Sequence, residues 1–583
     1  MTAARGRPSL ARATGVMAAG TALSRLTGFG RNIALAIAIG QNLLTDTYNL
    51  ANTTPNIIYE LLLGGVLSAT LVPLFVQLLA RVDTAGENDK DDNADNADNG
   101  EEAEAAWHDI SAVVTLAVVA SVVAAVAFLL AAPLLVSLYF GDRTADQRAV
   151  GTGLVRLFAP QVVAYAVIAL TTALLNARRR FAAPMFAPIA NNLVVIATIL
   201  LLPTVARSLE VGDFRHDGRA LAFLGLGTTL GVVAMAAVQV GRLRAAGLVG
   251  RRGGGDGGGR GAGGEGGGGR RAVRRGGLRP TWDLRAPSIR RVVGLSGWTL
   301  GVVVANQVAL LVVYRLAAGR EGGVTAYMTA LVFFLLPHGV YAVSVITALQ
   351  PDMAERWAAG DAAGLGERVA TGLRTILAVM VPAAVGLALV AGPLVRTLLL
   401  HGRFDAGDAR VTAGTLACFA LGLPGFSAFL FLTRVWQSMQ DTRTAFVLYV
   451  VENGANIALA VFLFPRFGVP GLAAAYGGAY TLAAGVTLAV LARRLPAGWL
   501  AGADAFSLRL AGATAGLAAA VAAAVLVVGA ALPPGSTRSA VQLALAVPVG
   551  AAAFLATAAA LGLREPLALV QPILGRVRRS RPG

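Results

Sequence analysis

The sequence contains very little cysteine, lysine or charge of either sign. Cys418 is the only cysteine among 583 residues, which excludes an internal disulfide and any cysteine metal site. Charged residues make up 14% of the chain and hydrophobic residues 56%, with a mean hydropathy of +0.66. An ordinary soluble domain carries about 25% charged residues. The composition therefore predicts an all-α polytopic membrane protein.

The signatures of an enzyme are also missing. The four histidines are scattered among hydrophobic segments, so they support neither a Ser/His/Asp triad nor a metal site beside paired carboxylates. Residues 250–277 are mostly glycine and arginine, but no Gly-Lys-Ser/Thr follows them, so they do not match a phosphate-binding loop. We expect neither enzymatic activity nor a cofactor. With no nucleotide domain, any work that the chain performs on a substrate must be driven by an ion such as sodium, by the membrane potential or by downhill flux.

The net charge of +17 comes almost entirely from arginine, since Lys90 is the only lysine. These arginines cluster in short segments between apolar runs, a pattern typical of cytoplasmic loops that contact anionic lipid. Binding to nucleic acid is therefore not expected.

Long apolar runs predict about 14 transmembrane helices. They lie near residues 13–39, 46–80, 107–138, 151–176, 183–206, 218–241, 292–317, 324–350, 368–394, 411–436, 443–464, 468–492, 508–531 and 540–563. An even number places both termini on one side. The arginine-rich loops face that side, so the positive-inside rule makes it the cytoplasm. We expect a multi-pass protein of the bacterial plasma membrane with both termini cytoplasmic.

A segment rich in glycine and arginine divides the predicted spans into two lobes. We predict an N-terminal lobe at 1–247 with a disordered acidic cytoplasmic insertion at 83–105, a flexible linker at 248–286, a C-terminal lobe at 287–495, two further spans at 496–563 and a basic cytoplasmic tail at 564–583. A short repeat aligns Asn191 with Asn453, which supports two parallel bundles with a substrate site between them.

The first predicted span carries two arginines, Arg25 and Arg31. An arginine at the centre of a membrane costs at least about 2.5 kcal/mol on insertion scales, so these side chains are expected to line a polar cavity rather than face lipid. Alternatively, Arg31 extends to the outer interface.

The second predicted span is polar in its outer half. Asn52, Asn56 and Glu60 recur every four residues and so share one face, and Asp46 enters from the outer side. Glu60 lies about 21 Å further along the helix, near the depth of Arg25. We therefore predict an Arg25–Glu60 ion pair, which either opens to admit an anionic ligand or simply holds the two helices together.

Several segments form a recognisable set. They are Ser24-Arg25-Leu26-Thr27-Gly28-Phe29-Gly30-Arg31, Thr45-Asp46-Thr47-Tyr48 with Pro55-Asn56, residues 176–192, Leu400-His401-Gly402-Arg403-Phe404-Asp405 and Gln440-Asp441-Thr442-Arg443-Thr444. These segments resemble the MurJ (MviN) lipid II flippases over nearly the whole chain. The resemblance implies an exporter of the multidrug/oligosaccharidyl-lipid/polysaccharide superfamily, with two six-helix lobes around a central cavity, two extra helices and a lipid-carrying groove. It also implies that Arg25, Arg31 and Asp46 lie in the cavity.

Two positions depart from the family pattern. Tyr59 and Val332 stand where the family commonly carries arginines, so the cavity is less cationic than in its relatives. Arg434 and His338 remain as further candidates for an anionic headgroup, although a histidine beside a proline in a membrane helix is more often a packing residue.

Glu452, Asn453 and Asn456 gather within one turn of the eleventh predicted span. Such oxygen ligands suit sodium or a proton relay, and the resemblance makes a sodium site plausible; the alternative is that these groups bond neighbouring helices.

The function expected from all these features is a lipid II flippase that moves an undecaprenyl-diphosphate-linked peptidoglycan precursor to the outer leaflet by alternating access, for cell-wall synthesis and cell shape. The substrate-binding residues would be Arg25, Arg31, Asp46, Asn52, Asn56 and Glu60. The alternatives are an exporter of another polyprenyl-linked glycan or an amphipathic drug, and a transport-inactive scaffold for cell-wall proteins.

Overall fold

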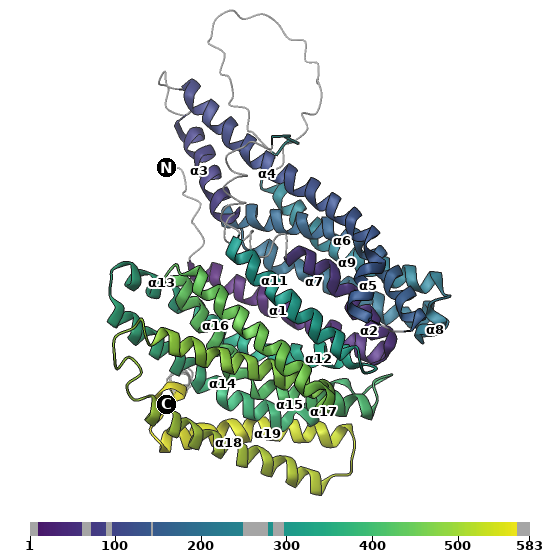
Figure 1. Ribbon diagram of the computed structural model, residues 1–583, viewed down its shortest axis with the longest axis vertical. Helices are drawn as coiled ribbons and strands as arrows, with labels where there is room; N and C mark the ends of the chain where they lie inside the picture. The colour runs from purple at the N-terminus through teal and green to yellow at the C-terminus, as the bar shows by residue number, and fades with distance from the viewer. Residues whose placement is uncertain are drawn as a thin grey trace, which may run out of the picture.

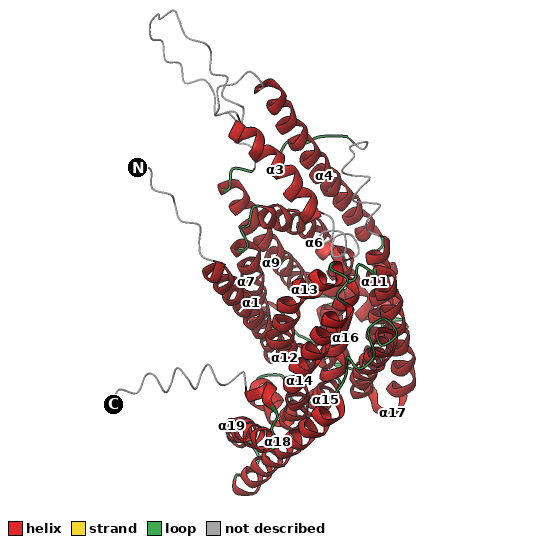
Figure 2. Cartoon of the chain, turned by 90° about the vertical axis from the view of Figure 1, so that its left-hand side faces the viewer, coloured by secondary structure: helices red, strands yellow, loops and turns green. Residues whose placement is uncertain are grey.

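The computed structural model describes residues 10–60, 71–88, 96–141, 144–248, 278–283 and 297–567. Every regular element within these ranges is a helix, as Figure 2 shows, and this confirms the predicted all-α fold. Ten of these helices are long and apolar enough to cross a membrane, or eleven if the bent pair α15 and α16 forms one span. The number of about 14 spans stays a prediction.

The first group of helices runs from α1 to α9 and occupies the upper part of Figure 1. Its members are α1 (Leu10–Ala38), α2 (Leu43–Tyr59), α3 (Val72–Asn88), α4 (Asn96–Leu130), α5 (Ala132–Phe140), α6 (Ala145–Ala177), α7 (Ala182–Val205), α8 (Val211–Phe214) and α9 (Gly218–Ala245). Here α1 packs on α7, while α2 packs on α6. We call this group the N-lobe.

The second group runs from α11 to α17, and most of it lies below the first group in Figure 1. Its members are α11 (Gly297–Ala317), α12 (Gly323–Pro337), the π-helical turn η3 (His338–Ala342), α13 (Val343–Ala358), α14 (Ala362–Leu399), α15 (Ala406–Leu421), α16 (Leu423–Ser438) and α17 (Thr442–Leu491). We call it the C-lobe. Two further helices, α18 (Ala503–Ala531) and α19 (Ser536–Ala560), pack on each other and on α14 at its edge.

The helix α17 contains two of the predicted spans, near 443–464 and 468–492. Its 50 residues are interrupted at Gly468, where φ is +61° and ψ is −141°. Glycine takes up such a conformation at little cost because it has no Cβ. The segments before and after Gly468 pack against each other: a Cβ on Gly478 would lie 3.4 Å from Leu459 Cδ1. The label α17 thus covers two helices that meet at a kink, and the kink lies between the two segments that the sequence separates.

The acidic insertion differs from its prediction as a disordered segment. α3 continues to Asn88 and α4 begins at Asn96, so helix covers most of residues 83–105, and the two helices extend beyond the rest of the N-lobe in Figure 1. The prediction was wrong because alanine and glutamate favour helix, and because Ala106 and Trp107 bury an apolar face against α3. Arg178 also binds Asp83 at 2.6 Å to Oδ1.

One end of the predicted flexible linker is held in place. The backbone N–H of Arg279 donates to Ser111 Oγ at 3.2 Å, and that of Thr281 donates to Thr115 Oγ1 at 3.0 Å, so residues 278–283 lie along α4. Residues 249–277 and 284–296 of this region, and the tail from residue 568, lie outside the described residues. The other predicted domain boundaries stay predictions.

The junction between α15 and α16 crosses the second half of α17 with very little space between the two backbones. A Cβ on Gly422 would overlap Gly477 Cα, and a Cβ on Gly477 would lie 2.7 Å from Gly422 Cα. Small residues let membrane helices approach in this way, so the packing of α15, α16 and α17 requires glycine at both positions.

We expect Gly477→Ala to destabilise the protein by about 1–3 kcal/mol, because the added methyl overpacks this crossing. Thermal unfolding of the purified protein in detergent measures the effect. Gly485→Ala on the same helix is the matched control, since a Cβ there meets nothing within 4 Å. Equal unfolding temperatures for the two variants would show that the crossing tolerates a larger residue.

Candidate functional site

Arg25 projects from α1 toward the opposite lobe. Its guanidinium lies against Gly339 in η3, where any Cβ would overlap it, so glycine is required for the arginine to take this position. The side chain is exposed. On its own side, Asn192 of α7 donates to Ser24 O at 3.3 Å and to Thr27 Oγ1 at 3.0 Å, which holds this part of α1. The prediction from sequence did not select Asn192 or Gly339.

His338 stands next to this arginine site but is itself a packing residue. Its Nδ1 lies 2.9 Å from Ser427 Oγ, and its ring meets Phe426 at a centroid distance of 4.7 Å. These contacts support the interpretation of His338 as a packing residue. The other arginine of the first helix, Arg31, is half-buried and close enough to Tyr48 of α2 to interact with it electrostatically.

Asp46 connects the two lobes. Its Oδ1 accepts hydrogen bonds from the backbone N–H of Thr325 at 2.9 Å and from Thr325 Oγ1 at 2.7 Å. Thr325 lies in the first turn of α12, where unpaired N–H groups and the helix dipole attract a negative charge. Asn49 adds a bond from Nδ2 to the same hydroxyl at 3.1 Å. A carboxylate of the N-lobe thus caps a helix of the C-lobe.

Further contacts join the lobes at the same end. The positive-inside rule predicts that this end, where α1 ends and α2 begins, is the outer one, and we call it the outer end. The backbone N–H of Arg403 donates to Ile37 O at 3.1 Å, and Thr412 Oγ1 donates to Gln41 Oε1 at 2.9 Å. We call these two contacts, together with that of Asp46 and Thr325, the outer seal.

The loop motifs that point to the family have local structural roles here. Asp405 forms a capping box with Asp408 at the start of α15. Asp441 caps α17, accepting from the N–H of Thr444 at 3.0 Å and from its hydroxyl at 2.8 Å. The backbone hydrogen bond from Thr444 is the largest of the effects that hold the pKa of Asp441 below its usual value.

The predicted Arg25–Glu60 pair is wrong. Glu60 Oε2 accepts a hydrogen bond from Gln307 Nε2 of α11 at 2.6 Å, whereas Arg25 lies against Gly339. None of the ion pairs among the described residues joins the two side chains. Counting residues along two helices gives their depth but not the direction in which each side chain points. Asn52 and Asn56 are half-buried on the same helix as Glu60.

Glu452, Asn453 and Asn456 form a buried polar cluster on the first half of α17, with exposed fractions of 1%, 6% and 5%. Asn453 Nδ2 donates to Asn306 Oδ1 of α11 at 2.7 Å and to Tyr449 O at 2.8 Å, so this residue does bond a neighbouring helix.

Some side-chain oxygen atoms of α17 and of its neighbour α11 form no hydrogen bond to another helix. Within the described chain, Glu452 Oε2, Asn456 Oδ1 and Gln307 Oε1 are buried and accept no hydrogen bond. A buried acceptor left unsatisfied costs about 1–3 kcal/mol, so such atoms suit a cation. The described residues hold no group of three or more His, Cys, Asp or Glu side chains that could bind a metal, so an ion here would depend on amide oxygens.

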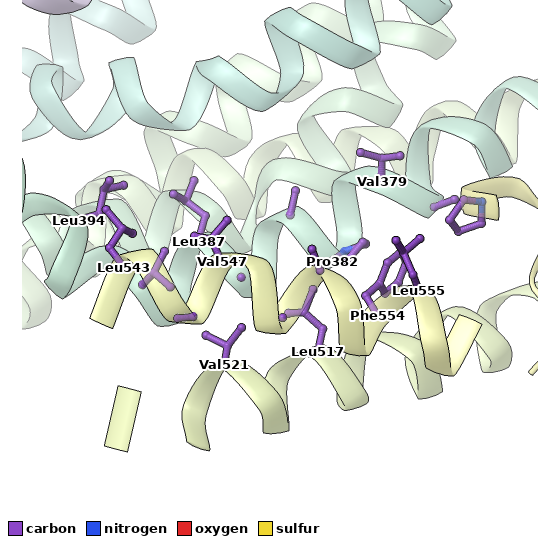
Figure 3. A pocket seen from close by; sticks show the side chains of 18 residues that line it. Val379, Pro382, Leu387, Leu394, Leu517, Val521, Leu543, Val547, Phe554 and Leu555 are labelled. Carbon is purple, nitrogen blue, oxygen red and sulfur yellow. The ribbon is translucent and has the colours of Figure 1, made fainter. Parts of the chain in front are cut away.

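An apolar groove lies between α14 and the helices α18 and α19. Figure 3 shows side chains from all three helices directed into it, and its volume is about 520 Å³. All its lining residues are apolar, including Leu387, Leu394, Leu517, Val547 and Phe554. No polar residue pattern marks this groove, so it could not be located from the sequence except through the family resemblance.

Two helical lobes that meet at an outer seal, with charged groups directed between them, have the architecture of a membrane transporter. A family model described as lipid II flippase MurJ matches residues 35–541. The chain belongs to this family, and the resemblance found in its motifs is thereby confirmed.

Relatives and solved structures agree with this assignment. The chain is 26% identical over 475 residues to a probable lipid II flippase MurJ of Rhizobium meliloti, covering 80% of this chain and 78% of that protein. It is 27% identical over 427 residues to the lipid II flippase MurJ of Burkholderia cenocepacia, covering 73% and 72%.

The fold is also similar to two solved transporters. One is a lipid II flippase MurJ in an inward closed conformation, with a TM-score of 0.67, 17% identity and coverage of 94% and 99%. The other is an inward-facing multidrug resistance MATE family transporter, with a TM-score of 0.61, 12% identity and coverage of 81% and 94%.

We expect Asp46→Ala to destabilise the protein by about 1–3 kcal/mol, because the N–H and hydroxyl of Thr325 lose their acceptor in a buried place. Thr325→Ala removes the hydroxyl, with its bonds to Asp46 and Asn49, but keeps the N–H bond to the Asp46 carboxylate and should have the smaller effect. Thermal unfolding in detergent measures both, with the exposed first-turn acid Asp504→Ala as control. If the Asp46→Ala protein unfolded at the same temperature as the Asp504→Ala control, the capping role would be contradicted.

Proposed function

We propose that this chain is a lipid II flippase that moves the precursor from the inner to the outer leaflet by alternating access of its two lobes. The observation that carries the proposal is the position of Arg25 between the lobes of a MurJ family chain. The family and the long apolar helices make the chain a transporter of the bacterial inner membrane. Cytoplasmic termini, contact with anionic lipid and association with cell-wall proteins belong to the proposal.

Arg25 would bind the diphosphate of the headgroup. A guanidinium presents its N–H donors as a planar fork that matches two phosphate oxygens at once, and its charge persists at any physiological pH. Gly339 leaves the room that this side chain needs, and Asn192 fixes the turn of α1 that carries it. Arg31, six residues further toward the outer end, would extend the positive path.

The outer seal determines which leaflet the cavity faces. With Asp46 bound to Thr325, the lobes are joined at the outer end, so a headgroup enters from the opposite side. Release outward requires this contact to break. Asp46 is therefore a gate residue in our proposal, and it acts by capping α12 rather than by pairing with an arginine. The hydrogen bond from Gln307 to Glu60 is a further bond between the lobes that has to break or move.

The apolar groove would hold the polyprenyl chain. A groove of apolar side chains offers a hydrocarbon tail the same environment as lipid while the headgroup crosses through the polar region between the lobes. Its place on α14, α18 and α19 accounts for the two helices that follow the C-lobe.

An ion would supply the driving force. The site that we propose for sodium is at Glu452 and Asn456 of α17, where Oε2 and Oδ1 are buried and accept no hydrogen bond among the described residues. Carboxylate and amide oxygens are suitable ligands for a hard monovalent cation. The helix α11 packs on α17 and carries Gln307, which donates to Glu60, so the helix beside the proposed site contacts the opposite lobe.

The rival function is export of another polyprenyl-linked glycan or an amphipathic drug. It is favoured by Tyr59 and Val332, which leave the region between the lobes with fewer cations for a diphosphate. Complementation of a strain depleted of its lipid II flippase separates the two, since a drug exporter does not restore growth. A transport-inactive scaffold would restore no flipping in purified vesicles.

Arg25→Ala should reduce flipping at least about 100-fold, and Arg25→Lys should retain part of it, because a point charge cannot form the planar fork. Fluorescent lipid II in proteoliposomes measures the rate. Arg219→Ala, at an exposed arginine of α9, is the control and should flip normally. Wild-type flipping by a normally inserted Arg25→Ala protein would reject the assigned role.

Glu452→Gln should raise the sodium concentration that gives half-maximal flipping by about tenfold or more, since a charged ligand is replaced by a neutral one. The assay exchanges sodium for potassium at constant ionic strength. Glu355→Gln, at an exposed carboxylate of α13, is the control. If wild-type protein flips equally fast in either salt, the sodium site has to be abandoned.

A further inference from the structure

Asp46, an acidic residue of the N-lobe, contacts the C-lobe at the outer end. A basic residue of the C-lobe, Arg315, contacts the N-lobe at the same end. The last turn of α11, in the C-lobe, meets the last turn of α5, in the N-lobe. There Arg315 donates from a guanidinium nitrogen to the backbone carbonyl of Leu138 at 3.2 Å. Tyr139 and Tyr314, the neighbours of these two residues in sequence, are both buried, so the contact lies beside a packed interface.

The contact has a clear electrostatic basis. The last carbonyl groups of a helix have no partner within it and carry the negative end of the helix dipole, so a cation there is favourable. α5 ends at Phe140, which places Leu138 among these carbonyls. Arg315 thus caps the C-terminus of an N-lobe helix, just as Asp46 caps the N-terminus of a C-lobe helix.

Gly141 gives the arginine its space. A Cβ at this position would lie 3.2 Å from one guanidinium nitrogen of Arg315 and 3.4 Å from its central carbon. The residue also has φ of +55°, a conformation that side chains disfavour. The end of α5 is therefore shaped so that the arginine of the other lobe can reach its carbonyls.

The chain connects the two caps directly. α11 ends at Ala317 and α12 begins at Gly323, so Arg315 and Thr325 stand on either side of one short turn of the C-lobe. Asp46 holds one side of this turn and Leu138 holds the other. Separation of the lobes at the outer end has to break both contacts together.

We propose that Arg315 is a positioning residue for transport: it caps α5 across the lobe interface and, with Asp46, sets how much of the protein is closed at the outer end. The proposal rests on alternating access but concerns the balance between its two states. It assigns Arg315 no contact with the transported lipid.

The test measures the outer opening directly. Spin labels at His216 in the N-lobe and Thr537 at the start of α19, both exposed, report the distance between the lobes in a Cys418→Ala background. Arg315→Gln should raise the ratio of long to short distances about fivefold in proteoliposomes, since it removes a charge-assisted hydrogen bond. Arg315→Lys should fall between it and the unsubstituted protein. Arg320→Gln, which removes an exposed arginine from the turn after α11, should leave the ratio unchanged.

Gly141→Ala provides a second variant, because its Cβ would lie 3.2 Å from a guanidinium nitrogen and forces a small shift of Arg315 without changing its charge. It should raise the ratio by less than Arg315→Gln does, and combining the two should add little, since both act on one contact. An unchanged distance ratio in Arg315→Gln, or full additivity in the double variant, would overturn the proposal. A raised ratio in a protein that flips no lipid II would keep this proposal and reject the flippase function instead.

Discussion

The structure depends most on the bond between a buried carboxylate of one lobe and the first turn of a helix in the other. Asp46 is 2% exposed, and it satisfies both the N–H and the hydroxyl of Thr325. A helix terminus in a membrane has few other partners for its unpaired N–H groups, so this contact is strong enough to close the outer end and yet confined to one turn. A closure of this kind can be broken without unfolding either lobe.

Three charged groups on the described membrane helices lie where the lobes meet or where a lobe encloses them. Arg25 faces Gly339, Glu60 bonds Gln307, and Glu452 lies within the C-lobe. Each such group costs free energy against lipid, and each is accommodated by a specific neighbour or by room left by glycine. Charged residues that would be unfavourable in an isolated membrane helix therefore mark the surfaces of the folded chain that we expect to move or to bind a ligand.

Much of the fold could be derived from the sequence. The apolar runs gave the helices, and the motif around Arg25 indicated the family, which the match over residues 35–541 confirms. The acidic insertion was misjudged because composition suggested disorder, while burial of Ala106 and Trp107 against α3 makes its flanks helical. The partner of Arg25 was misjudged for a related reason: helical periodicity gives depth and face within one helix, but not the neighbour that this face meets.

The sequence by itself determined the class of protein, its all-helical character and the residues whose charge is costly in a membrane, because hydropathy and charge act along the chain. Only the tertiary structure decided what those residues contact. Asp46 reaches Thr325 across 279 positions of sequence, and Glu60 reaches Gln307 across 247. Such contacts depend on how α2 packs on α6 and how the lobes are turned toward each other, and no local pattern encodes that orientation.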